Sequence, residues 1–348
     1  MVILGIDMGW GNSVSCLFNK ETGEVAYEGI STNRESYKKR ISAVKPDLVV
    51  IEAGPMAGWV RDLCEQLGVR LLVLNTNDEP WQWSKVKKKT DRKDALKLTQ
   101  LAAFSQTTPV HVPQRKVRQW RQLIQYRDTL GSEIISIKNR LRGLLLQEDI
   151  RLPAGAKAWS PAEYAKLKAM AKPLGKCKED EIWQGMIGME MDRMEELEKQ
   201  QALIEKKLNG IAKQDKRVEL LMTVPGVGVR TAEAVVSMID VAERFGRGRE
   251  ISCYVGLTPR KYQSGKMDRD GHISRAGNGL LRKLLNQAAW SGMRSCPRMK
   301  MIFEKVKRKS PKRNKTAIVA VSRHLIVWLW AMLRDGREYQ ATVPKMAA

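Results

Sequence analysis

The first 108 residues alternate short apolar runs with amphipathic stretches, and the order of these segments restricts the possible folds. Three apolar runs come first and are joined by glycine-containing turns, which predicts an antiparallel meander. These runs are residues 2–7, 13–19 and 24–30. Periodicity then predicts a helix, a strand, a helix, a strand and a helix. These segments are residues 33–44, 47–53, 55–67, 70–75 and 91–105.

This order is that of a ribonuclease-H-like (RuvC-like) α/β fold, in which the first and fourth strands are neighbours in the sheet. An acidic residue ends each of these two strands, Asp7 in VILGID and Glu52 in LVVIEA. Asp91 and Asp94 are placed at i and i+3 on a predicted helix, so they share a face. Four such carboxylates can hold a pair of Mg²⁺ ions roughly 4 Å apart, an arrangement that cuts phosphodiester bonds.

Each carboxylate also has an ordinary structural explanation. Asp7 can cap a turn, Glu52 can pair with Arg61, and Asp91 lies where a helix begins. Taken together, the four favour a metal site, because convergent carboxylates repel one another unless a cation neutralises them. The sequence therefore predicts Mg²⁺ as a cofactor.

The charge of the chain indicates a polyanionic partner. The formal net charge is +24, and its densest basic clusters are KVKKKTDRK (85–93) and KVKRKSPKRNK (305–315). A merely soluble surface would have its charges scattered, whereas these are clustered. Four basic residues beside Asp91 are expected to draw a nucleic-acid backbone toward the metals. They are Lys87, Lys88, Lys89 and Arg92.

Cysteine usage and hydropathy predict a cytoplasmic protein that does not enter a membrane. The five cysteines are far apart and form no CxxC pair, which argues against a zinc ribbon or a disulfide framework. The N-terminus enters a strand directly, so no secretory leader is expected. The longest apolar stretch, residues 317–333, contains Arg323 and His324, which predicts a buried helix rather than a membrane span.

Two long amphipathic helices are predicted after the α/β part. They cover residues 115–147 and 190–213 and can pair as a coiled-coil hairpin or form a dimer interface. Residues 151–189, between them, contain several prolines and are predicted to be a connector with some helix. The chain is thus expected to have three parts: 1–108, a helical region over 109–215, and a mainly helical domain over 216–340.

The segment LLMTVPGVGVRTAEAVVSMI (220–239) predicts a helix-hairpin-helix motif. Gly226 and Gly228 would let the backbone turn and approach a phosphate, while the N–H groups that open the second helix, near Arg230, point at it. Such contacts position nucleic acid without reading its sequence. The alternative is an ordinary glycine-rich connection between helices.

A second basic segment, residues 254–285, contains candidate nucleophiles. Five cations can surround a phosphate there: Arg260, Lys261, Lys266, Arg269 and Arg275. Ser264 is expected on a turn in QSG, and Ser274 lies before the next predicted helix. A serine hydroxyl among cations can attack phosphorus, because the cations stabilise the developing charge. Loop serines are more often turn formers, so composition alone leaves the role of Ser264 open.

Several motifs together resemble the DEDD-type insertion-element transposases that carry a catalytic serine, a bacterial family that includes the pilin-gene invertase. The motifs are GID (5–7), IEA (51–53), KTDRKDA (89–95), VPGVG (224–228) and GLTPRKYQSG (256–265). The resemblance covers nearly the whole chain. It implies a RuvC-like domain, a helical pair and a small helical transposase domain. The chain departs from the family in IEAGPMAG, where I-E-A-T-G is more usual.

The resemblance also implies the chemistry. The acidic tetrad falls on Asp7, Glu52, Asp91 and Asp94, and the nucleophile on Ser264, which would form a phosphoserine link to DNA. Donor and target DNA would pair with a structured bridge RNA, as in other guided systems. A dimer or tetramer would bring the two domains together from different protomers.

Other functions stay open at this level. One is a RuvC-like metal-dependent nuclease or Holliday-junction resolvase that uses water in place of Ser264. Another is a site-specific DNA invertase of the same family, and a third is a nucleic-acid-binding scaffold without chemistry.

Overall fold

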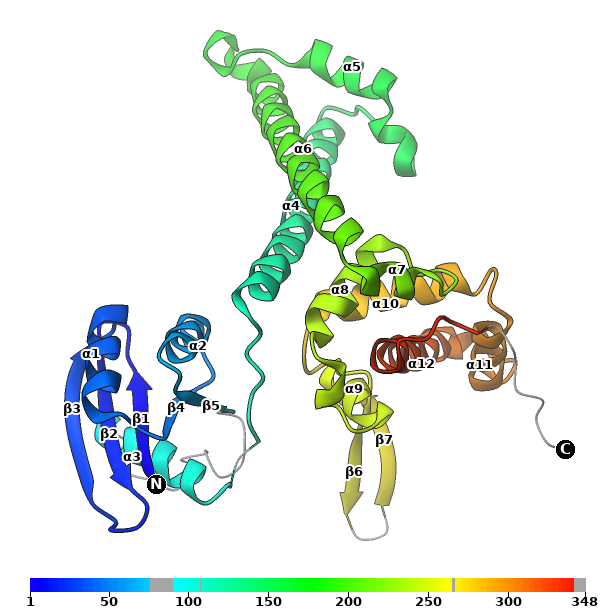
Figure 1. Cartoon of the computed structure of the whole chain (residues 1–348). Helices are drawn as coiled ribbons and strands as arrows, with labels where there is room; N and C mark the ends of the chain where they lie inside the picture. The colour runs from blue at the N-terminus through cyan, green and yellow to red at the C-terminus, as the bar shows by residue number, and fades with distance from the viewer. Residues whose placement is uncertain (76–89, 107, 265–266, 341–348) are drawn as a thin grey trace, which may run out of the picture. The chain divides into compact units, whose positions relative to one another are not determined.

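The computed structural model describes residues 1–75, 90–106, 108–264 and 267–340 (Figure 1). Of the residues singled out above, Lys87, Lys88, Lys89 and Lys266 lie outside these ranges. The chain divides into two compact units, Met1–Arg118 and Gln119–Ala348.

The first unit contains a five-stranded mixed sheet with the strand order β3-β2-β1-β4-β5. The strands are β1 Val2–Met8, β2 Asn12–Asn19, β3 Val25–Ser31, β4 Leu48–Glu52 and β5 Arg70–Leu74. The first three strands are antiparallel, whereas β4 and β5 run parallel to β1 and to each other. The predicted strands and the predicted adjacency of the first and fourth strands are confirmed, so the order is that of a ribonuclease-H-like sheet.

Helices lie on both faces of this sheet. They are α1 Arg34–Val44, α2 Ala57–Gln66 and α3 Asp91–Ala103. Along β1, Leu4 and Ile6 pack in one cluster with α1 and α2, whereas Ile3 packs in another with α3. Because both faces are covered, β1 from Val2 to Ile6 and β4 from Leu48 to Ile51 show no alternation with polar residues.

The predicted helical pair consists of α4 Arg115–Gln147 and α6 Ile182–Gln214. The second unit begins at Gln119, within the first turns of α4. The connector contains α5 Pro161–Met170 and three short 3₁₀ turns, η2 Gly155–Trp159, η3 Leu174–Lys176 and η4 Glu179–Glu181. One buried apolar cluster fills the seam between α4, α5 and α6. Its members are Leu130, Ile134, Ile137, Leu141, Leu145, Leu167, Ile187, Met191, Met194 and Leu197.

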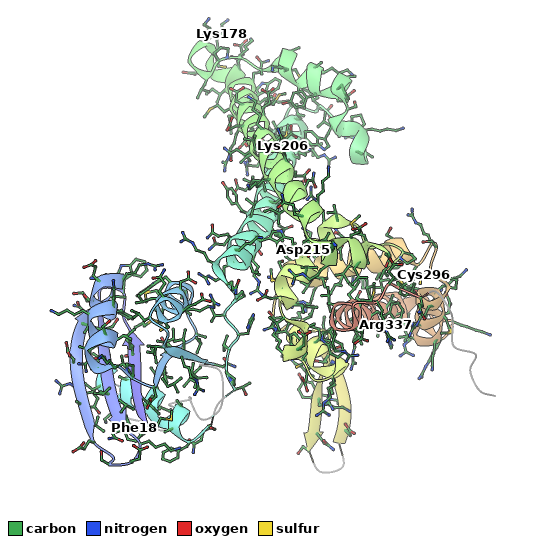
Figure 2. All side chains as sticks on the ribbon, viewed as in Figure 1. Phe18, Lys178, Lys206, Asp215, Cys296 and Arg337 are labelled. Carbon is green, nitrogen blue, oxygen red and sulfur yellow. The ribbon has the colours of Figure 1, made fainter. Side chains whose placement is uncertain are left out.

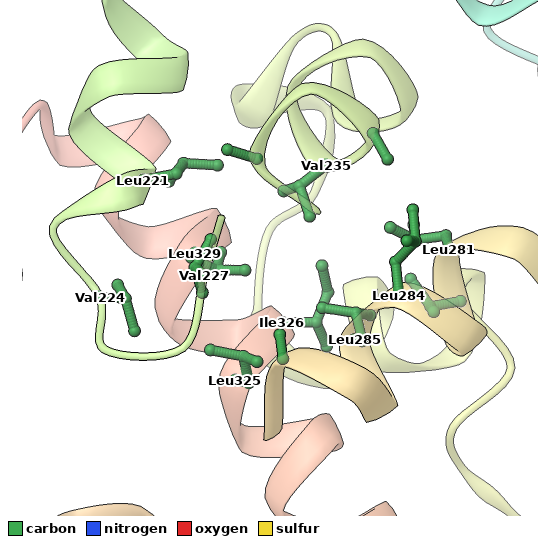
Figure 3. Close-up of a cluster of buried hydrophobic side chains, with 14 of the residues drawn as sticks. Leu221, Val224, Val227, Val235, Leu281, Leu284, Leu285, Leu325, Ile326 and Leu329 are labelled. Carbon is green, nitrogen blue, oxygen red and sulfur yellow. The ribbon is translucent and has the colours of Figure 1, made fainter. Parts of the chain in front are cut away.

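The rest of the second unit is helical except for one hairpin. Its elements are α7 Lys216–Met222, α8 Val229–Ile239, η5 Ala242–Arg244, α9 Gly248–Tyr254, β6 Pro259–Ser264, β7 Met267–Ile273, α10 Gly279–Gly292, α11 Pro297–Lys307, η6 Pro311–Arg313 and α12 Asn314–Asp335. Figure 3 shows how Leu221, Val235, Leu285 and Leu325, from α7, α8, α10 and α12, meet in its core.

The same core includes residues from the near ends of the helical pair, Trp120 and Ile124 from α4 and Leu208 and Ala212 from α6. The pair and the C-terminal helices therefore share one hydrophobic core, which is why they form one compact unit.

The helix α12 is the predicted buried helix of residues 317–333. Within the described residues it is the one helix long and apolar enough to cross a membrane by length and composition, and half of its most apolar window is buried. Leu325 and Leu329 are fully buried in the core of the second unit, so α12 is a core helix there.

A buried ion pair joins α4 to α8. Arg127 Nη1 lies 2.6 Å from Oε1 of Glu233, and the side chains are 8% and 0% exposed. Burial raises the pKa of the Glu233 carboxyl in spite of Arg127 and Arg230, which act in the opposite direction. At the Glu233 carboxyl, the effect of desolvation on the pKa therefore outweighs the attraction of the two guanidinium groups.

We expect Arg127→Met to lower the free energy of unfolding by about 3 kcal/mol, because it leaves the buried Glu233 carboxyl with Arg230, at 3.4 Å, as its remaining cation among the described residues. A second change, Glu233→Leu, is expected to recover much of that loss, since no buried charge then remains. Urea unfolding of the two variants and the wild type measures both effects. A single variant as stable as the wild type would contradict the prediction.

Candidate active site

Asp7 and Glu52 lie at one edge of the sheet. The last paired residues of β1 and β4 are Ile6 and Ile51, and each acidic residue follows its pair by one position. Side chains alternate along a strand, so Asp7 points to the same face as Ile3, and Glu52 to the same face as Val50. Ile3 and Val50 pack in the cluster that contains α3. Both half-buried carboxylates are therefore on the α3 face of this edge, which we call the acidic edge.

The first turn of α3 is directed toward the acidic edge. A Cβ on Gly5 would lie 2.6 Å from the Ala95 carbonyl oxygen and 2.7 Å from Thr99 Cγ2, so only glycine lets α3 pack this closely on β1. Ile3 shares its cluster with Leu101, near the other end of α3. Along β1, Ile3 therefore lies near the C-terminal part of α3 and Gly5 lies near its middle. Asp7, two residues further along β1, is thus expected beside the N-terminal turn of α3.

Asp91 and Asp94 occupy that first turn of α3. Asp94 is 3% exposed, whereas Asp91 is exposed. Burial lowers the pKa of Lys97, one turn further, while the charge of Asp94 opposes this shift. Acidic residues are favourable at a helix N-terminus in any protein, so their position alone does not prove a metal role.

The four carboxylates are thus brought to one edge and one face of the sheet. Within the described ranges, no three His, Cys, Asp or Glu side chains are close enough to form a ready metal cluster. Carboxylate oxygens are the ligands that Mg²⁺ prefers, so the chemistry of these donors suits Mg²⁺, and a metal site here stays a prediction. Arg61, which the sequence offered as a partner for Glu52, pairs with Glu65 at 3.0 Å on its own helix.

The VPGVG turn joins α7 to α8, as predicted, and its two exposed or half-exposed glycines differ in their surroundings. Gly226 has a φ of +86°, and a Cβ there would lie 2.3 Å from the Gly292 nitrogen and 2.5 Å from the Ala288 oxygen. The close backbone approach that the sequence assigned to a phosphate is therefore made at Gly226 by α10. At Gly228, the N-cap of α8, a Cβ would meet nothing within 4 Å.

Arg230, at the start of α8, is held by two acidic side chains. Its guanidinium lies 3.4 Å from Glu233 and 3.6 Å from Glu205 of α6. A phosphate contact at this turn therefore falls mainly to Gly228 and the N–H groups that open α8. That contact stays a prediction, as does the contact assigned to Gly226.

We expect Gly226→Ala to destabilise the protein by about 2–4 kcal/mol, since the new methyl group meets α10 backbone at a positive φ. Gly228→Ala is the matched control. It is expected to cost less than about 1 kcal/mol, the penalty of a poorer N-cap. Thermal unfolding compares the two variants, and equal losses would show that the approach of α10 is not what requires glycine.

Ser264 is the last residue of β6, in a two-stranded hairpin that the sequence did not predict. It pairs with Met267 of β7 and is exposed. Tyr262 is paired directly with Arg269, and the Arg269 guanidinium lies 5.4 Å from the Tyr262 ring centroid. Residues at i and i+2 share a face of a strand, so Ser264, Tyr262 and Arg269 share one face of the hairpin.

The other predicted cations are distributed around the same hairpin. Lys261 lies on the opposite face, 3.4 Å from Asp268. Arg260 donates to the Ser274 carbonyl, and Arg275 stands at the hairpin base in a left-handed conformation with a φ of +55°. Ser274 is a turn residue whose hydroxyl accepts from Ala276 N. Arg92, from the other basic cluster, stacks on Tyr27 at 5.7 Å in the first unit.

The sequence did not predict this hairpin, because its strands contain five charged residues and few β-branched residues, a composition that is more typical of a loop. The signal that was available is the S-G dipeptide at residues 264–265, which marks a turn between two segments of similar length.

Two models of known protein families match this chain. A DEDD-type transposase model, described as "Transposase", matches residues 4–148. A second, described as "Transposase IS116/IS110/IS902 family", matches residues 218–304. The chain belongs to this transposase family. The first match contains all four carboxylates, and the second contains the VPGVG turn and the Ser264 hairpin. The resemblance to insertion-element transposases is thus confirmed, and the protein is an enzyme of DNA cleavage and strand transfer.

Similar proteins carry related names. The transposase for insertion sequence element IS1111A of Coxiella burnetii is 25% identical over 97% of this chain and 91% of its own length. The pilin gene-inverting protein of Moraxella lacunata is 27% identical over 36% of this chain and 40% of its own. Among solved structures, Thermus thermophilus RuvC aligns over 32% of this chain and 100% of its own with a TM-score of 0.24 and 13% identity.

Proposed function

We propose that this transposase cuts and rejoins DNA through a covalent phosphoserine at Ser264. The observation that supports this role is the place of the residue: an exposed hydroxyl at the end of β6, on the hairpin face that also carries Tyr262 and Arg269. A cation two residues across the hairpin can stabilise the charge that develops on a phosphate attacked there.

The reaction balances without an energy source. The Ser264 Oγ loses its proton and bonds to the scissile phosphorus, while the P–O3′ bond breaks and the 3′ oxygen gains a proton. In the reverse sense, the 3′-hydroxyl of another strand attacks the phosphoserine, a new phosphodiester forms, and the serine is released. The covalent link conserves the bond energy, so strands can be exchanged without ATP.

We infer that the acidic edge is the second half of the catalytic apparatus. Asp7, Glu52, Asp91 and Asp94 would hold Mg²⁺, which when bound supplies charge neutralisation at the scissile phosphate. The support is that β1, β4 and the first turn of α3 bring these carboxylates to one edge and one face. The rest of this apparatus would come from a dimer or tetramer, as the family resemblance implies.

We also propose that a structured RNA accompanies the protein and selects donor and target DNA by base pairing. Basic residues support a large polyanionic partner. Lys206, which is labelled on α6 in Figure 2, is exposed, as are Lys207 and Lys213 on the same helix. The cluster that follows α11 is also exposed at Arg308 and Lys312.

The purified protein is expected to carry a specific RNA, and its affinity for nucleic acid is expected to fall steeply with salt. Each phosphate neutralised by Lys or Arg releases a counterion, so several contacts cost roughly a thousandfold or more between about 50 and 200 mM salt. Sequencing the bound RNA and titrating binding at several salt concentrations test both points. Protein free of RNA, with binding indifferent to salt, would contradict the proposal.

Two other functions remain to be separated by experiment. A RuvC-like nuclease or Holliday-junction resolvase would need the acidic edge but not Ser264. A site-specific invertase of the same family would use both and differ only in its DNA. The Ser264 variant considered in the Discussion distinguishes the first from the proposed reaction, and the arrangement of the DNA products distinguishes the second.

A further inference from the structure

Trp10 is 98% exposed, more than any other described large apolar side chain. It lies in the short loop between β1 and β2, flanked by Gly9 and Gly11. Tryptophan is rarely left in water, because its ring offers a large apolar area for burial. Its two neighbours in the loop are glycines, and Met8, the nearest apolar residue before them in the chain, is half-buried, so Trp10 is the one exposed ring of this loop.

The loop that carries Trp10 is held firmly by Thr32. The Thr32 hydroxyl donates to the Gly9 carbonyl at 2.9 Å, and the Thr32 N–H donates to the Gly11 carbonyl at 2.9 Å. The Thr32 hydroxyl is itself bonded to that of Ser13 at 2.7 Å. Both neighbours of Trp10 are therefore fixed to β3 and β2, and the ring is presented on a defined backbone.

The loop belongs to the acidic edge. It follows β1 directly, and Asp7 is three residues before Trp10. Because Asn12 pairs with Ser31, the end of β3 and the start of α1 lie at the same edge. The exposed ring is thus carried by a loop at the same edge of the sheet as Asp7 and Glu52.

We propose that Trp10 stacks on a nucleobase next to the phosphate that is bound at the acidic edge. Every base has an aromatic face, so a stack tolerates any sequence and suits an enzyme whose sequence choice is made by base pairing. A stacked base would fix the register of the strand, which makes Trp10 a substrate-positioning residue. The inference rests on the proposed role of the acidic edge.

The test uses duplexes from the ends of the encoding element, each with a single 2-aminopurine at a successive position. Stacking on Trp10 is expected to quench one or two neighbouring positions, Trp10→Ala to abolish that quenching, and Trp10→Phe to retain most of it. The Michaelis constant for DNA is expected to rise roughly tenfold or more in Trp10→Ala, the size of a lost stack. The turnover number should change less, and thermal stability should not change, because the ring packs against so little.

Phe104→Ala is the matched control, since Phe104 is 61% exposed and caps the other end of α3. It is expected to leave both the quenching and the Michaelis constant unaltered. The inference is overturned if Trp10→Ala keeps the wild-type quenching or Michaelis constant, or if Phe104→Ala changes them equally. Quenching of 2-aminopurine reports base stacking and does not require cleavage. An error in the assignment of the metal ligands or of Ser264 would therefore change the cleavage assay and leave the quenching as it is.

Discussion

Ser264→Ala is expected to bind nucleic acid like the wild type and to produce neither strand cleavage nor a covalent protein–DNA adduct. The substitution removes one oxygen from an exposed strand end, so the free energy of unfolding should change by no more than about 0.5 kcal/mol. Cleavage should fall at least about a thousandfold, because the variant lacks the hydroxyl that is proposed to bond to phosphorus.

The measurement combines a cleavage assay with mapping of the trapped adduct. Wild-type protein on a substrate that prevents rejoining should give an adduct that survives denaturant and lies in the peptide that contains Ser264. Ser274→Ala is the matched control, since Ser274 is a turn residue of the same hairpin base, and it should retain cleavage. Cleavage by Ser264→Ala at the wild-type rate, or an adduct on Tyr262, would show that the nucleophile is misassigned.

The outcome also separates the two enzyme classes. A hydrolytic nuclease would give cleavage with no adduct at any residue, and Ser264→Ala would then be harmless. Tyr262 is the alternative within the covalent class, because it is 44% exposed on the same hairpin face. Its ring lies over Gly271, where a Cβ would meet Tyr262 Cε2 at 2.5 Å, so Tyr262 already has a packing role.

The sheet could be predicted because its signals are local. Apolar runs such as Val2–Met8 and Leu48–Glu52 are bounded by turns, and their order leaves few topologies. The acidic residues could be predicted for the same reason, since a strand that ends in a carboxylate places it at a sheet edge. Their distance from one another depends on packing, and the sequence does not supply it.

What could not be predicted depends on contacts between distant segments. The helix α6 begins at Ile182 rather than at residue 190, and its added turns contain Gly185 and Gly188, which lower helix propensity. Gly185 is required by packing, since a Cβ there would lie 2.7 Å from Leu174 Cδ1. Gly226 likewise packs against α10, a helix more than fifty residues away in the chain. The requirement for glycine at this position therefore cannot be read from the local sequence.

Asp7→Asn is expected to reduce cleavage at least about a hundredfold while leaving the fold intact. Asn keeps the size of Asp but loses the charge, and the remaining carboxylates bind a divalent cation more weakly. The same loss should follow from EDTA in the wild type, and added Mg²⁺ should restore activity to the wild type far better than to the variant. The assay is cleavage at a series of Mg²⁺ concentrations, with unfolding measured in parallel.

Asp47→Asn is the matched control, because Asp47 precedes β4 at the opposite edge of the sheet and accepts from the Val2 N–H at 2.7 Å. It should keep the wild-type dependence on Mg²⁺.

Asp94→Asn tests the helix side of the acidic edge, since Asp94 is the buried member of the set and its loss cannot be replaced by solvent. Full cleavage in EDTA, or equal effects of Asp7→Asn and Asp47→Asn, would remove the metal site from the proposal. A loss confined to Asp7 and Asp94 would place the metal where β1 and α3 meet.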